Sequence, residues 1–121
     1  NWVSCQDIGE VSAAYLRMAV EGTVTFGDGK FLTVEVTGGE CNTFSLTEYV
    51  AMLTSVVEEV RGGGKVIYTD LPLPEEAEYG DLWRFLRAGG FDAVTDTVCR
   101  VLSREPLGLR RYITERLQKN S

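Results

Sequence analysis

The longest amphipathic pattern in the chain covers residues 45–60, SLTEYVAMLTSVVEEV. Ser45 and Glu48 form an S-x-x-E capping box, in which each side chain accepts a hydrogen bond from the backbone N–H of the other residue. The apolar residues that follow repeat at helical spacing and share one face: Leu46, Tyr49, Val50, Leu53, Val56, Val57 and Val60. The pattern predicts an amphipathic helix whose apolar face is covered by a sheet.

Helical patterns also occupy the beginning and the last third of the chain. A first helix is predicted at about Gln6 to Val20, with Asp7 as its cap rather than as a catalytic acid, because a short carboxylate can accept hydrogen bonds from free backbone N–H groups. An aromatic helix is predicted within residues 75–90. A short helix is predicted within residues 94–105, and a last one within residues 107–117.

Between the helical patterns, apolar residues alternate as they do in β-strands. Residues 24–26 and 32–36 alternate with period two on either side of Gly-Asp-Gly-Lys, which is typical of a β-hairpin. Residues 65–69 predict a further short strand that is closed by prolines, and residues 1–5 are typical of the end of a buried strand. The sequence therefore predicts a mixed domain of few short strands and about four to five helices.

Length and charge narrow the class of protein. A chain of 121 residues corresponds to one domain, here residues 1–121. Its 12 Lys and Arg against 18 Asp and Glu give a net charge of -6, which argues against nucleic-acid binding. Apolar runs of about 20 residues and a cleavable leader are both missing, so we expect no membrane span and a cytoplasmic or other reducing, soluble compartment. Six arginines at helical spacing are expected on solvated faces: Arg84, Arg87, Arg100, Arg104, Arg110 and Arg111.

The side chains offer little catalytic chemistry. The chain contains no His, which removes the commonest general base and the commonest metal ligand. Cys5, Cys41 and Cys99 form no C-x-x-C pair, so we expect buried free thiols and neither a disulfide framework nor a zinc site. The glycine clusters at residues 27–29 and 62–64 lead into strands rather than into helices, so we expect turns and not phosphate-binding loops. No catalytic residue is assigned within this chain.

The order of several segments resembles a known family. VSCQDIGEVSAAYL is followed by GKFLTVEVTGGECNTFSLTEYVAMLTSVV, then by VIYTDLP, by an aromatic helix and by VTDTVCRVLSREPLGLRRYITE. Together these segments resemble the C-terminal part of the NmrA-like, atypical short-chain dehydrogenase/reductase family, over nearly the whole chain. The resemblance implies an α/β fold, namely the C-terminal part of a Rossmann-type NAD(P)-binding fold.

The resemblance also implies a division of labour. NADP or NAD would be bound mainly by an N-terminal Rossmann half that precedes Asn1, and the present residues would form the substrate-side half of an oxidoreductase or of an NAD(P)-binding protein. A start in the middle of a strand agrees with that interpretation. The Tyr-x-x-x-Lys pair of the short-chain family does not occur in this sequence. The small-molecule substrate is unknown.

Four residues are candidates for binding that substrate. Trp2 and Gln6 flank the end of the opening strand, where open α/β sheets place their ligands. Tyr79 and Trp83 lie four residues apart and share a face of the aromatic helix, although aromatic residues at this spacing are more often core positions. The alternative function is that of a non-catalytic module, either redox-sensing or protein-binding, which could associate with itself as a homodimer.

Overall fold

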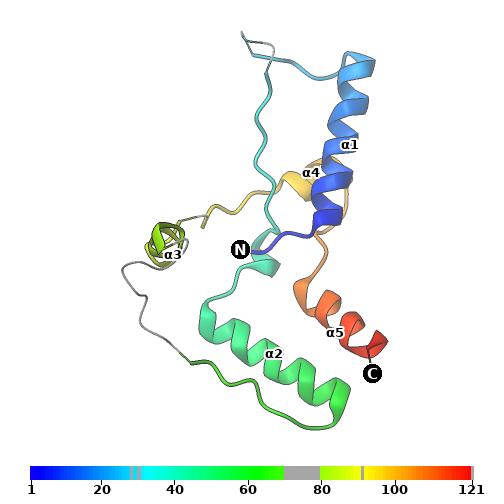
Figure 1. Cartoon of the computed structure of the whole chain (residues 1–121). Coiled ribbons are helices and arrows are strands. Elements are labelled where there is room, and N and C mark those ends of the chain that lie inside the picture. Colours follow the sequence, from blue (N-terminus) through cyan, green and yellow to red (C-terminus); the bar gives the residue numbers. More distant parts are fainter. Residues whose placement is uncertain (28, 30, 70–79, 91, 121) are drawn as a thin grey trace.

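The computed structural model describes residues 1–27, 29, 31–69, 80–90 and 92–120 (Figure 1). Five α-helices and one 3-10 helix follow one another along the described chain: α1 (Cys5–Glu21), η1 (Glu40–Asn42), α2 (Leu46–Arg61), α3 (Gly80–Arg87), α4 (Thr97–Leu102) and α5 (Leu109–Lys119). The helices predicted from the sequence are therefore present. None of those described is long and apolar enough to cross a membrane.

The predicted α/β fold is wrong for this chain, because the described residues form no β-strand and no sheet. Residues 31–37 do follow an extended path beside α1 (Figure 1). The predicted hairpin closes with one bond, from the N–H of Gly27 to the C=O of Phe31 at 3.2 Å, and no ladder continues from it in the described chain. Alternation fixes which side chains share a face, but a strand exists only where a second backbone pairs with the first.

Two helix starts are set by serine caps. Ser45 Oγ accepts from the N–H of Glu48 at 3.2 Å, and Glu48 Oε2 accepts from the N–H of Ser45 at 2.7 Å, which confirms the predicted capping box of α2. At α1 the cap is Ser4, whose Oγ accepts from the N–H of Asp7 at 2.9 Å. The prediction that Asp7 caps this helix is therefore wrong, and its carboxylate is free to face the interior.

Four of the five described α-helices pack in two pairs. α1 lies against α4, and α2 lies against α5 (Figure 1). Val11 and Ala14 of α1 and Val98 of α4 are buried, as is Val56 of α2. The apolar face of α2 is thus covered by a helix and not by the sheet that its pattern predicts. A helix satisfies its own backbone, so a partner helix can replace a sheet without any strand pairing.

Much apolar surface stays exposed. The chain exposes 9152 Å², whereas a compact protein of 13.4 kDa exposes about 6,500 Å². The excess is therefore roughly 2,600 Å². Its apolar contributors include Leu16, Val20, Phe31, Ile67, Trp83 and Tyr112. Burial of these side chains requires a surface that the described chain does not supply.

Loss of the capping box gives a direct test of α2. We expect Ser45→Ala to lower the free energy of unfolding by about 0.5–2 kcal/mol, because the backbone N–H of Glu48 loses its partner, the hydroxyl of Ser45. Urea unfolding followed by circular dichroism measures this change. Thr47→Ala, at an exposed position in the same helical turn, is the control and should change stability much less. Equal losses in the two variants would contradict the assignment.

Candidate functional site

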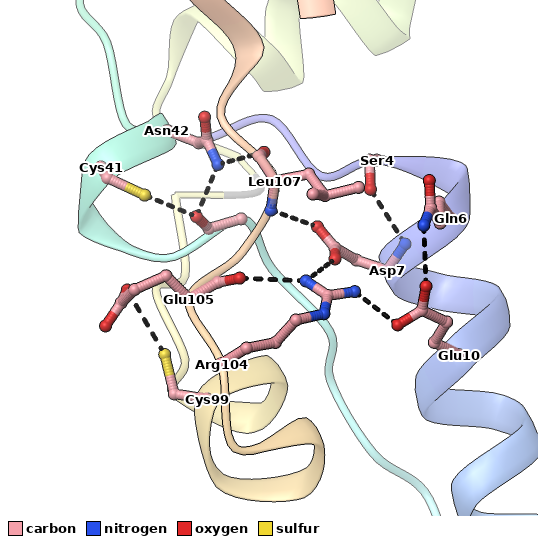
Figure 2. A network of polar contacts seen from close by, with 11 residues as sticks. Ser4, Gln6, Asp7, Glu10, Cys41, Asn42, Cys99, Arg104, Glu105 and Leu107 are labelled. Atoms are coloured by element: carbon pink, nitrogen blue, oxygen red, sulfur yellow. Dashed lines mark hydrogen bonds and ion pairs between the residues drawn. The ribbon is translucent and has the colours of Figure 1, made fainter. Parts of the chain in front are cut away.

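Asp7 lies at the centre of a polar network that joins α1 to the chain between α4 and α5 (Figure 2). Its side chain is 0% exposed. Oδ1 accepts from Nη1 of Arg104 at 2.8 Å, and Oδ2 accepts from the N–H of Leu107 at 2.9 Å. Because both oxygens are engaged by groups of the same chain, Asp7 positions two segments and is not available to a ligand as an acid or base.

Arg104 connects this carboxylate to a second one. Its Nη2 donates to Oε2 of Glu10 at 2.6 Å, and its Nη1 also donates to the C=O of Glu105 at 2.9 Å. Hydrogen bonding to Glu10 and Asp7 raises the pKa of Arg104. The bond from Arg104, with a smaller contribution from Gln6, lowers the pKa of Glu10. The guanidinium of Arg104 therefore links α1 to the segment that follows α4, whereas the helical spacing of the arginines predicts a solvated side chain.

Asn42 performs the same role with an amide. Its Nδ2 donates to the C=O of Gly38 at 2.9 Å and to that of Leu107 at 3.0 Å (Figure 2). Its Oδ1 accepts from the N–H of Leu109 at 2.8 Å, and its backbone C=O accepts from the N–H of Trp2 at 3.0 Å. One buried residue, through its side chain and its backbone C=O, thus joins the start of the chain, the η1 segment and the start of α5.

Two glycines allow this close approach. A Cβ on Gly38 would collide with the backbone C=O of Trp2, so no other residue fits there. Gly39 has a φ of 71°, in the left-handed region that glycine adopts without strain. The pair Gly38–Gly39 is therefore required by the crossing of the first residues over the η1 segment.

A hollow of about 510 Å³ lies beside the network. Its wall includes polar groups of Cys41, Cys99, Asp96 and Glu105. The predicted burial of the free thiols is wrong, because Cys5 and Cys41 are exposed and Cys99 is only partly covered. Cys99 Sγ donates to Oε2 of Glu105 at 3.6 Å (Figure 2). Burial, followed by the charge of Glu105, raises the pKa of the Cys99 thiol, so it stays protonated at neutral pH and is a weak nucleophile. The described residues contain no cluster of three metal-ligating side chains.

An apolar groove of about 430 Å³ runs between α1 and the extended chain. From the extended chain it is lined by Leu32, Val34 and Val36, which confirms that alternate residues of this segment share a face. The residues of α1 that line it are Val11, Ser12, Tyr15, Leu16 and Ala19. Leu16 lies at the rim of the groove and is 69% exposed. Val24 and Phe26 complete the lining.

The predicted substrate residues do not form one site in the described chain. The ring of Trp2 stacks on Tyr49 of α2, with centroids 5.3 Å apart and planes 19° apart. Gln6 is exposed and donates to Glu10 at 2.8 Å. Trp83 is 52% exposed on α3, which excludes the core position that its spacing also allowed. Tyr79 lies outside the described residues, and the assignment of all four residues to a substrate stays a prediction.

The residues that the sequence analysis missed are Arg104 and Asn42. The sequence does contain a signal for a partner such as Arg104. Asp7 lies at helical spacing from Val11 and Ala14, and therefore on the buried face of α1. A carboxylate on a buried face requires a cation. The sequence does not indicate which of its twelve basic residues supplies that cation.

No protein-family model matches the chain, and no curated protein or solved structure matches it significantly. The resemblance to the NmrA-like family therefore stays a prediction.

Removal of the Asp7 carboxylate tests the network. We expect Asp7→Ala to lower the free energy of unfolding by about 3–5 kcal/mol, because two hydrogen bonds to a charged group are lost, each worth about 1.5–3 kcal/mol, and the N–H of Leu107 is left without its partner. Urea unfolding measures the change. Gln6→Ala, at the adjacent exposed position, is the control and should cost much less. A loss for Asp7→Ala of only about 0.5–2 kcal/mol would indicate that the residue acts as a simple cap.

The lowered pKa of Glu10 predicts acid sensitivity. Since folding lowers this pKa from its ordinary value of 4.5, the ionised carboxylate stabilises the fold above that pH. The stabilisation is lost as the pH falls from 4.5 through the lowered pKa. Urea midpoints measured across this range should fall more steeply for the unsubstituted chain than for Glu10→Gln. Parallel curves would show that Glu10 makes no contribution.

Proposed function

We propose that this chain is a protein-interaction module without catalytic residues of its own. The observation that carries the proposal is the exposed area, which exceeds that of a compact protein of this mass by roughly 2,600 Å². Permanent protein complexes bury about 2,000–5,000 Å² in total, counted over both partners. The excess on this chain alone is thus large enough for such an interface.

The location of the apolar side chains supports the same proposal. Leu32, Val34 and Val36 line one wall of an open groove, and Leu16 forms part of the opposite rim. Phe31 is 81% exposed at the start of the same segment. A contiguous apolar area of this kind on a charged protein is typical of a surface that binds another protein.

The chemistry of the polar groups agrees with a non-catalytic role. Asp7 and Glu10 are bound to Arg104, and the thiol of Cys99 is held protonated beside Glu105. The buried side-chain polar atoms of the described residues all have hydrogen-bond partners. A catalytic site instead needs at least one acid, base or nucleophile that is free to meet a ligand.

A second candidate function is the substrate-side half of an NAD(P)-dependent protein of the NmrA-like family. The stacked pair of Trp2 and Tyr49 favours it, because a half-exposed aromatic surface can bind a planar ligand. NADP or NAD would then be bound by a separate N-terminal half. Calorimetry with the isolated chain should accordingly detect binding of neither dinucleotide, and tight binding of either one would exclude this division of labour.

A dye that fluoresces on apolar surfaces tests the interaction module. We expect the dilute chain to bind anilinonaphthalene sulfonate, and we expect Leu16→Lys to reduce the fluorescence several-fold because it charges the rim of the groove. Val20→Lys is the matched control, since Val20 is 89% exposed on the same helix but does not line the groove. A folded chain that binds no dye would contradict the proposal.

A further inference from the structure

The interaction surface includes the extended backbone of residues 31–37, and the two edges of this backbone differ in their hydrogen bonding. In extended chain, the N–H and C=O groups of alternate residues point to opposite edges. The C=O of Phe31 accepts from Gly27, and the C=O of Glu35 accepts from the Thr97 hydroxyl at 2.6 Å and from the Thr95 hydroxyl at 3.2 Å. The odd-numbered edge is therefore occupied by this chain at Phe31 and at Glu35.

The even-numbered edge is open. The described residues supply no hydrogen bond to the backbone of Leu32, Val34 or Val36. The side chains of these three residues meanwhile face the groove along α1. An open edge beside an apolar face is the arrangement to which another strand can be added.

We propose, on the basis of the interaction function above, that the occupant of this edge is a second copy of the chain, paired antiparallel through residues 31–37 about a two-fold axis at Val34. Each Val34 then lies opposite the other, and Leu32 lies opposite Val36 of the second copy. By symmetry, Val36 lies opposite Leu32 of the second copy. These three pairs of even-numbered residues exchange roughly six backbone hydrogen bonds. The interface is isologous, as in most dimers.

The segment is self-complementary in this register. The apolar side chains of both copies form one continuous row on the face toward α1, which joins the two grooves. On the other face, Glu35 lies opposite Thr33 of the second copy. A shift by two residues toward the C-terminus would place Glu35 opposite Glu35, and like charges at that distance are destabilising. The single charge of the segment thus disfavours that shifted register.

Area and charge are compatible with a dimer. The excess of roughly 2,600 Å² on each copy is enough for one side of a permanent homodimer interface, which buries about 2,000–5,000 Å² over both copies. Two copies of net charge -6 repel each other, but the pairing segment itself carries one charge, that of Glu35. Added salt screens the repulsion between the copies and should therefore tighten the dimer.

Cysteine cross-linking tests the register. In a background with Cys5, Cys41 and Cys99 replaced by Ser, Val34→Cys places two thiols on the two-fold axis, where Cα atoms about 5.5 Å apart permit a disulfide. We expect mild oxidation to link most of this variant into dimers. Glu35→Cys, one residue further along, is the matched control and should link far less, because its two Cα atoms would be more than about 7 Å apart.

Sedimentation of the unsubstituted chain provides a second measurement that does not depend on the variants. We expect the mass to approach twice 13.4 kDa as the protein concentration and the salt concentration rise. A monomer at every concentration, or equal cross-linking at positions 34 and 35, would overturn the paired dimer. If that monomer still binds the apolar dye at its groove, the interaction function stands with a different partner; if it binds none, both proposals fail.

Discussion

The ion pair between the buried Asp7 and the partly exposed Arg104 is the interaction on which the rest of this structure depends. It joins residues that are far apart in the sequence, and the N–H of Leu107 completes the shell of the carboxylate. Asn42 adds the η1 segment to the same junction. With four buried apolar side chains in the described core, a polar junction of this kind supplies much of the long-range order.

This junction explains why the apolar surface is open. It fixes α1, η1 and the start of α5 by hydrogen bonds, so the chain keeps its arrangement without burying the extended segment. The groove beside α1 is then held in place by groups that do not themselves occupy it. Stability and binding are therefore supplied by different residues. The binding surface can then be preorganised before the partner arrives.

The sequence predicted local features well and the fold class poorly. The capping box at Ser45, the helix at Gln6 to Val20 and the alternation of Leu32, Val34 and Val36 depend on neighbouring residues, and all three are present. The sheet is not present in the described chain, because its formation depends on a second backbone that no local pattern specifies. Arg104 was missed for the same reason, since its partner lies 97 residues away in the sequence.

The central claim, an open edge that closes on association, is tested most directly by hydrogen exchange at the backbone amide of Val34. We expect fast exchange in the dilute chain and strong protection as the concentration rises, while amides inside α2 stay equally protected throughout. An amide of Val34 that is protected to the same degree at every concentration would mean that the chain closes this edge by itself, and would contradict the account.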